Sequence, residues 1–345
     1  MYRIAIIGSG ISGLSAAHFL KTHAQITLFE KSRGSSGRAA TRRADPFAFD
    51  HGAQYFTVRT KPFQEFIQPL LDNGTIARWN PRYVKMEGPR IVERRHWAED
   101  EPRYVGVPGM NQIGKYLAQG LEIRLERKIV SLQHTGKWEL TDHLGQVHPG
   151  FDWVISTVPA PQALSLLPPS FLHYRDIEAI KMRACFALML GFEKPLPMEF
   201  EAANITKSNL NWIAMNSHKP NRPEPFTLVA HSTEEYAEAH LYDDHPTVMK
   251  QLVAETARIL GHGLGSIKHK GLHGWHHANN ADRKQNGAIW IDPGQNLAAC
   301  GDWCFGGRIE GAFTSAYNLA NTMLDSGLLT RGRVAQAPAT RLVNH

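Results

Sequence analysis

The chain of 345 residues has only three cysteines and no long apolar run. Cys185, Cys300 and Cys304 are odd in number and lack the spacing of zinc ligands, so we expect neither a disulfide framework nor a metal site. The longest apolar runs, such as residues 184–192, have the length of a strand and are too short to span a bilayer. Residues 4–7 run into a glycine turn without a cleavage site, which indicates a strand and no signal peptide. We therefore expect a cytoplasmic protein with no membrane partner.

The chain also lacks a block of basic residues, although its formal net charge is +6. Lysine and arginine are spread along the chain without exposed aromatic residues between them, so we expect no nucleic-acid partner. Basic side chains that face an anionic cofactor and a small anionic substrate would explain the charge equally well. A hydrophobic fraction of 42% predicts a globular protein with ample core, in one large domain or two closely joined ones.

Residues 4–30 have the pattern of a nucleotide-binding unit: a strand, a glycine turn, a helix, a second strand and an acidic residue. Gly8 would make the tight turn, Gly10 would let a pyrophosphate approach the backbone, and Gly13 would let the helix pack on the strand. The pyrophosphate would lie at the positive end of the helix. Glu30 ends the second strand, where its carboxylate can bind the hydroxyls of an adenosine ribose. The pattern predicts a bound dinucleotide.

A second glycine-rich segment, residues 31–38, follows Glu30 directly and ends in Arg38. Ordinary nicotinamide-dependent Rossmann proteins have no such loop at this point. Flavoproteins of the amine-oxidase and glutathione-reductase type do, because they hold a long, extended dinucleotide along its whole length. This segment therefore favours a flavin dinucleotide.

Two further motifs carry a family resemblance: Asp-His-Gly-Ala-Gln-Tyr-Phe at residues 50–56 and Cys-Gly-Asp-Trp-Cys-Phe-Gly-Gly-Arg-Ile-Glu-Gly-Ala at residues 300–312. With them, the chain resembles the renalase-like branch of the flavin amine-oxidase superfamily, in its bacterial form, from residue 1 to about 328. The resemblance implies an α/β fold, in which an FAD-binding Rossmann-like domain of the glutathione-reductase and amine-oxidase type is interleaved with an α+β substrate domain. The FAD-binding domain would comprise residues 1–60, 97–160 and 271–328, the substrate domain residues 61–96 and 161–270, and a loose tail residues 329–345.

The closing motif also has a physical reason to contact the flavin. A buried strand ends at Cys300, and a helix opens near Glu310 with its positive end aimed at the part of the flavin that gains charge on reduction. Asp302 would hold the ribityl chain. We expect one non-covalent FAD, since no cysteine lies in a recognisable flavin-linking loop. The expected FAD contacts are Gly8, Gly10, Ile11, Ser12, Gly13, Glu30, Lys31, Arg38, His51, Gly52, Ala53, Gln54, Tyr55, Ile129, Val130, Thr157, Gly301, Asp302, Glu310, Gly311 and Ala312.

No constellation of catalytic acid and base stands out in the sequence. Trp275, His276 and Tyr55 are candidates for the wall of a cavity at the flavin. Around Trp275 and His276 this chain departs from its relatives. His276 and His277 are adjacent and would point to opposite sides of a strand, which argues against a metal site. Weak candidates for binding substrate phosphates at the cavity mouth are Arg94, Arg95 and Lys219.

The resemblance implies an oxidase that acts on 2- or 6-dihydropyridine isomers of NAD(P)H. Hydride would pass to flavin N5 and then, with molecular oxygen as acceptor, yield hydrogen peroxide. Such a ring becomes aromatic when it loses hydride, so no protein base is required. Two alternatives stay open: an amine oxidase, in which Trp275 and Tyr55 enclose the amine, and a flavin-binding redox protein without turnover.

Overall fold

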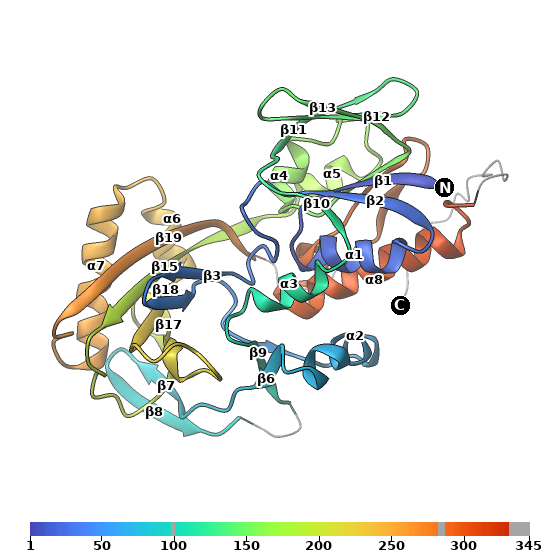
Figure 1. Cartoon of the computed structure of the whole chain (residues 1–345). Helices are drawn as coiled ribbons and strands as arrows, with labels where there is room; N and C mark the ends of the chain where they lie inside the picture. Colours follow the sequence, from blue (N-terminus) through green and yellow to red (C-terminus); the bar gives the residue numbers. More distant parts are fainter. Residues whose placement is uncertain (98–100, 282–286, 331–345) are drawn as a thin grey trace.

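The computed structural model describes residues 1–97, 101–281 and 287–330, and contains two large sheets (Figure 1). The first sheet has six strands in the order β10-β2-β1-β14-β21-β20. Its strands pair in parallel except for β20, which pairs antiparallel with β21. In that order the strands are Glu122–Arg124, Ala24–Phe29, Tyr2–Ile7, Trp153–Ser156, Leu297–Ala299 and Trp290–Asp292.

Both faces of this sheet are buried, which is why residues 4–7 of β1 are all apolar. Ile4 and Ile6 belong to the core formed with helices α1 (Ile11–Leu20) and α8 (Arg308–Asp325), which lie side by side in Figure 1. Ala5 and Ile7 belong to a second core, beneath a three-stranded antiparallel meander. The elements of this side are β11 (Ile129–His134), β12 (Trp138–Asp142), β13 (Val147–Phe151), α4 (Ala160–Leu164) and α5 (Tyr174–Glu178).

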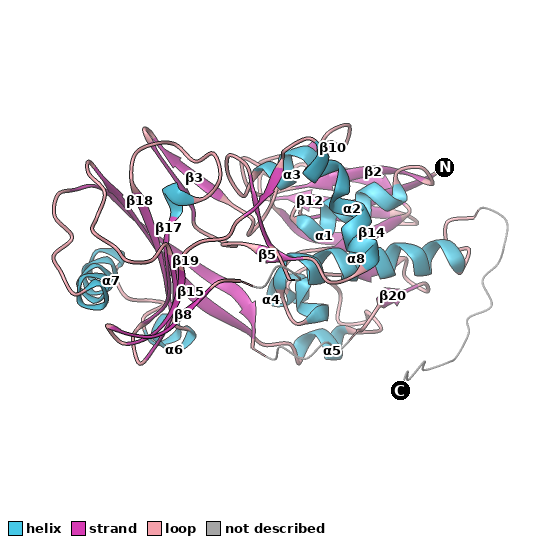
Figure 2. Ribbon diagram, turned by 90° about the horizontal axis from the view of Figure 1, so that it is seen from below, coloured by secondary structure: helices cyan, strands magenta, loops and turns pink. Residues whose placement is uncertain are grey.

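The second large sheet has seven strands in the order β19-β15-β18-β17-β16-β7-β8, all antiparallel except the pair β16 and β7. It covers the other half of the molecule (Figure 2). In that order the strands are Ile267–Asn280, Met182–Phe192, Thr227–Ser232, Leu210–Met215, Ala202–Thr206, Tyr83–Glu87 and Arg90–Arg95.

Helix α7 (His245–Leu260), preceded by α6 (Glu234–Ala239), packs on one face of this sheet. The side chain of Asp244 caps its N-terminus by accepting from Thr247 N at 2.9 Å, and Gly261 ends it with a φ of 74°. Val248, Leu252 and Ile259 are buried and form the apolar face of this amphipathic helix. The opposite face meets the hairpin of β3 (Thr41–Ala44) and β4 (Phe47–Asp50), where Phe47 and Phe49 form a small core with the sheet.

The remaining elements connect the two sheets. Helices α2 (Lys61–Asp72) and α3 (Gln112–Leu117) join the core of α1 and α8. A small antiparallel sheet contains β5 (Phe56–Thr57), β9 (Arg103–Gly106) and β6 (Ile76–Arg78). Two short 3₁₀ turns are η1 (Asn216–His218) and η2 (Asp302–Phe305). Within the described part of the chain, no helix is long and apolar enough to cross a membrane.

The α/β fold with a Rossmann-like half is confirmed. Two of the expected domain boundaries, however, fall inside elements: residue 160/161 lies in α4 and 270/271 in β19. Since α2, α4 and α5 pack in the cores of the six-stranded sheet, we propose a substrate domain limited to β7, β8 and the chain from β15 to β19. Of the expected tail, residues 331–345 lie outside the described residues.

Gly13 offers a test of how tightly the first strand and helix must pack. A Cβ atom at Gly13 would lie 2.0 Å from the Gly8 carbonyl oxygen, so we expect Gly13→Ala to lower the free energy of unfolding by at least about 1–3 kcal/mol. A Cβ atom at Gly263 would meet no atom within 4 Å, and Gly263→Ala is the matched control, with a change within about 0.5 kcal/mol. Urea denaturation measures both. Equal stability of the two variants would contradict this packing.

Candidate functional site

The glycine turn after β1 leaves the start of helix α1 open to a ligand. Gly8 has a φ of 104°, which only glycine adopts without strain, and Gly10 precedes the helix without offering a side-chain cap. A Cβ atom at Gly10 would meet nothing closer than 3.8 Å. Ile11 and Ser12 open the helix, and Ser12 Oγ donates to Ala312 O at 2.9 Å, which joins the starts of α1 and α8.

Glu30 lies beside this turn and is buried. Its carboxylate binds other residues of the protein and is not free for a ligand alone. Its carboxylate accepts from Ser9 N at 2.9 Å, from Ser9 Oγ at 3.1 Å and from Ser32 N at 2.8 Å. The side chain therefore ties the glycine turn to the next loop while it remains at the end of β2. Lys31 is exposed, and its Nζ donates to Gln162 Oε1 at 3.3 Å.

Arg38 joins three segments that are far apart in the sequence. Its guanidinium forms an ion pair of 2.5 Å with Asp302 and donates to the carbonyl oxygens of His277 and Ala278. A Cβ atom at Gly52 would lie 1.9 Å from Arg38 O, so only glycine allows this approach. The side chain of Arg38 is thus held between the closing motif and β19.

The closing motif supplies a second open helix start. Gly306 and Gly307 have φ values of 72° and 92°, and α8 begins at Arg308 without a side-chain cap. Helices α1 and α8 follow β1 and β21, which point the same way in one sheet, so both begin at the carboxyl edge of that sheet. Two helix N-termini at one edge suit an extended, anionic dinucleotide. This cradle fits the predicted FAD.

Several predicted contact residues have other positions or partners. Glu310 accepts from Arg59 N, Thr60 N and Thr60 Oγ1 at 2.7–3.1 Å, so its carboxylate is bound to the two residues directly before helix α2. The hydroxyl of Thr157 donates to the carbonyls of Ile7 and Gly8. Ile129 is buried, whereas Val130 is 44% exposed. Gly301 and Gly311 pack closely, against Trp303 and Phe305 respectively.

His51 is paired with Trp275 and not with His276. The two rings stack at 5.2 Å, and Trp275 Nε1 donates to His51 O at 2.8 Å. His273 meets His51 edge to face at 5.0 Å. His276 is exposed and has a ring contact with His277 at 6.5 Å. The structure thus brings Trp275 to the motif of residues 50–56, while His276 lies outside this group.

Burial keeps these histidines neutral. The pKa of His51 is lowered to about 3, mainly because burial removes water from the ring. The nearby His273 and Arg42 make smaller contributions in the same direction. The same effect lowers the pKa of His273 to about 4 and that of His231 to about 4. His51 Nδ1 is buried without a hydrogen-bond partner among the described residues, so no side chain orients this ring as a base.

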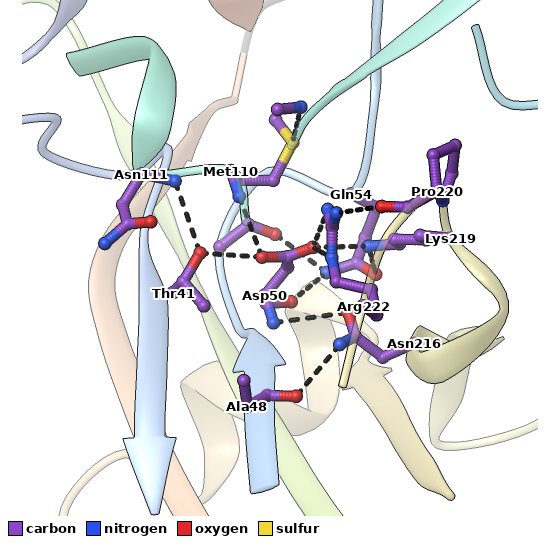
Figure 3. Close-up of polar contacts among 12 residues, drawn as sticks. Thr41, Ala48, Asp50, Gln54, Met110, Asn111, Asn216, Lys219, Pro220 and Arg222 are labelled. Atoms are coloured by element: carbon purple, nitrogen blue, oxygen red, sulfur yellow. Dashed lines mark hydrogen bonds and ion pairs between the residues drawn. The ribbon is translucent and has the colours of Figure 1, made fainter. Parts of the chain in front are cut away.

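The most highly connected side chain of the site is one that sequence analysis missed. Asp50 is fully buried, and Figure 3 shows the donors around it. Its Oδ1 accepts from Thr41 Oγ1 at 2.7 Å and Met110 N at 2.9 Å, while Oδ2 faces Lys219 at 3.3 Å and Arg222 at 2.7 Å. Its place as the first residue of the Asp-His-Gly-Ala-Gln-Tyr-Phe motif was the one available signal.

Lys219 was a candidate for binding substrate phosphates at the mouth of a cavity. Its side chain is completely buried, so it does not lie at a cavity mouth. Arg94 and Arg95 are exposed on β8 and form ion pairs with Glu199 and Glu93. Neither lies in the Asp50 network. A phosphate-binding group from these three residues is not assembled in the structure.

Tyr55 lies in a cluster of aromatic rings that sequence analysis did not identify. Its ring centroid lies 4.9 Å from Trp97, 5.7 Å from Trp212 and 6.4 Å from Trp79. Trp79 Nε1 is buried without a partner among the described residues. The tryptophans come from distant segments, so no local motif connects them to Tyr55.

The described residues contain no group of three or more metal-ligating side chains. Cys185, Cys300 and Cys304 are free and buried. Burial raises the pKa of Cys185 and of Cys304 to about 12, and also raises that of Cys300. The thiols are packed in the interior, including the two that flank Asp302.

Comparisons with known proteins agree with this geometry. The sequence model of the flavin-containing amine oxidoreductases matches residues 91–324, and that of the NAD(P)-binding Rossmann-like domain matches residues 6–70. Renalase from Mus musculus is 23% identical over 350 residues, which cover 94% of this chain and 99% of renalase.

Solved structures show the same fold at low identity. A putative protoporphyrinogen oxidase from Exiguobacterium sp. 255-15 has a TM-score of 0.74 at 14% identity and covers 93% of this chain and 98% of its own. Reduced UDP-galactopyranose mutase has a TM-score of 0.74 at 12% identity, with coverage of 96% and 98%. Putrescine oxidase bound to putrescine has a TM-score of 0.68 at 14% identity, with coverage of 94% and 99%.

Glu30 can be tested with its amide. Glu30→Gln keeps the shape but removes the charge, and we expect it to weaken FAD binding by roughly 1.5–3 kcal/mol. Because Glu30 also accepts from Ser9 and Ser32, the melting temperature of the apoprotein should fall slightly as well. Titration of apoprotein with FAD measures the affinity, and Glu139→Gln, on the distant strand β12, is the control. Unchanged FAD affinity would place the ribose elsewhere.

Asp50 predicts a specific loss of stability in acid. Burial by itself would raise the pKa of Asp50, but Lys219 and Arg222 lower it below the ordinary value of 3.8. Its stabilising contribution is therefore complete above pH 3.8 and is lost as the pH falls through the lower, folded-state pKa.

We expect Asp50→Asn to lower the free energy of unfolding at pH 7 by about 3–5 kcal/mol, because two buried cations lose their partner. Its stability should then depend less on acid than that of the wild type, when urea midpoints at pH 7 and pH 3 are compared. The control is Asp72→Asn on the exposed end of α2. If the stability of Asp50→Asn depended on acid as that of the wild type does, the pKa of Asp50 would not be lowered in the folded protein.

Proposed function

Since the chain belongs to the flavin-containing amine oxidoreductase family, we propose that this FAD-dependent oxidoreductase oxidises 2- or 6-dihydropyridine isomers of NAD(P)H. Bound FAD would supply the hydride acceptor, with molecular oxygen as the final oxidant and hydrogen peroxide as product. The similarity to renalase over 94% of the chain supports this choice of reaction. The buried free thiols suit a reducing, cytoplasmic location.

The cofactor would be held by the residues of the cradle without a covalent bond. The start of α1 would bind the pyrophosphate, Glu30 the adenosine ribose, and Asp302, fixed by Arg38, the ribityl chain. The start of α8 would stabilise negative charge on the flavin. The buried, protonated thiols of Cys300 and Cys304 have no nucleophilic character to form a link.

The observation that carries the proposal is the neutrality of the histidines beside loop 51–55. His51, His231 and His273 have pKa values of about 3, 4 and 4, so none is positively charged at pH 7 or titrates near it. Groups with such low pKa values are weak bases for removing a substrate proton at pH 7. A substrate that becomes aromatic on losing hydride needs only orientation and exclusion of water, which the chain can provide.

The amine-oxidase alternative has one observation in its favour. The rings of Tyr55, Trp79, Trp97 and Trp212 form an aromatic cluster beside the same loop. Aromatic faces attract cations, and putrescine oxidase shares the fold. A small amine would then bind near Tyr55.

Anaerobic stopped-flow reduction separates these functions. We expect the flavin band to bleach with 2- or 6-dihydropyridine nucleotides and to stay unchanged with putrescine or other small amines. Admission of oxygen should then restore the band and release hydrogen peroxide. Bleaching with amines alone would establish the amine oxidase, and slow reduction by every donor would indicate a redox protein without turnover.

The rate of this reduction should vary little between about pH 5.5 and 7.5, where an ordinary histidine titrates. His51→Ala and His276→Ala should keep the same flat profile. FAD occupancy, measured by absorbance, controls for loss of cofactor. A tenfold fall in the rate of flavin reduction at acidic pH, if either substitution abolished it, would show that a histidine takes part in the chemistry.

A further inference from the structure

A buried lysine lies next to loop 51–55 without an evident structural need. The Lys219 side chain is 0% exposed, and its Nζ donates to Asp50 Oδ2 at 3.3 Å and to Gln54 Oε1 at 3.2 Å. It also lies 5.2 Å from the centre of the Trp79 ring. Since no part of Lys219 is exposed, it acts on a ligand only through its neighbours.

Asp50 is well paired without Lys219. Arg222 donates to Asp50 Oδ2 twice, from Nε at 3.1 Å and Nη2 at 2.7 Å. Thr41 and the Met110 amide bind the other carboxylate oxygen. The network therefore holds two cations and one carboxylate, and its second cation costs free energy to bury.

The other charged and titratable groups around Lys219 do not remove this excess. His231, on β18, is neutral at pH 7, with a pKa of about 4. Arg222 adds a positive charge, and Asp50 is the acidic group of the cluster. Burial lowers the pKa of Lys219 to about 8, although Asp50 opposes this shift. Because burying the ammonium group of Lys219 costs free energy, we infer that this lysine has a role other than stability.

Gln54 shows what that role is. Its Oε1 accepts from both Lys219 Nζ and Trp212 Nε1, so its Nε2 must point the other way. There Nε2 donates to the carbonyl oxygens of Asp50 at 2.5 Å and Gly52 at 3.1 Å. Figure 3 shows Gln54 beside Asp50 and Lys219. If the amide were reversed, its oxygen would face two carbonyl oxygens and the loop would open.

We propose that Lys219 is a positioning residue of the flavin site, which fixes the amide of Gln54 and thereby the shape of loop 51–55. This proposal rests on the proposed function only in that the loop faces the flavin. Lys219 reaches the loop from the turn after η1, which follows strand β17 of the seven-stranded sheet. This sheet would therefore control the shape of a segment of the cofactor site. Tyr55 and the backbone of Ala53 would then be presented in one orientation.

The test uses Lys219→Met, which keeps the length of the side chain and leaves Asp50 paired with Arg222. We expect a melting temperature equal to or above that of the wild type, since a buried charge is removed. We also expect FAD to bind about tenfold more weakly, as for the loss of one charge-assisted hydrogen bond. Amide hydrogen exchange should become faster in residues 51–55. Lys207→Met, which removes an exposed lysine paired with Glu87, is the matched control.

A double-mutant cycle shows whether Lys219 acts through Gln54. Gln54→Met should also weaken FAD binding, and Lys219→Met should add nothing to it. Additive losses, unchanged FAD affinity in Lys219→Met, or a marked fall in its melting temperature would each overturn the proposal. Failure of the wild-type holoenzyme to oxidise dihydropyridines would refute the proposed function alone, because the affinity and exchange measurements need no substrate.

Discussion

The carboxylate of Asp50 is the interaction on which the site depends. It accepts from β3, from the segment before α3 and from the turn after η1, and its own backbone N–H donates to Asn216 Oδ1 at 3.2 Å. These segments come from both halves of the molecule. Because the carboxylate is fully buried, its partners cannot be replaced by water, and the segments are held in one arrangement.

The pair of Arg38 and Asp302 extends this arrangement to the cofactor cradle. Arg38 belongs to the second glycine-rich loop and Asp302 to the closing motif. The two carbonyl oxygens that accept hydrogen bonds from Arg38 belong to β19. Arg38 thus ties the cradle to the seven-stranded sheet, and Asp50 ties the chain before loop 51–55 to the turn that follows a strand of the same sheet. A shift of β19 would act directly on the hydrogen bonds of Arg38.

Burial explains why three histidines of the site are neutral at pH 7. His51, His231 and His273 are kept neutral by loss of water, and Lys219 is held out of reach of any substrate. The proposed reaction suits such a site, since the substrate itself supplies the driving force when its ring becomes aromatic. The chain then contributes shape, orientation and a few fixed charges.

Local patterns in the sequence were reliable wherever a residue's role depends on its neighbours in the chain. Gly8 and Gly13 have the turn and the close packing predicted for them. The family motifs likewise predicted the α/β fold and FAD. Glu310 was assigned to the cofactor because it opens a helix, but the structure directs its side chain to α2.

The sequence by itself determined the nucleotide-binding unit, because a strand, a glycine turn and a helix form from about thirty consecutive residues. Only the tertiary structure decided the rest of the site. Asp50 and Lys219 are 169 residues apart, and Tyr55 and Trp212 belong to different halves of the fold. Neither pair has a local signal, since which side chains share a buried space depends on how the sheets pack. For the same reason Lys219, a surface candidate by composition, lies in the interior.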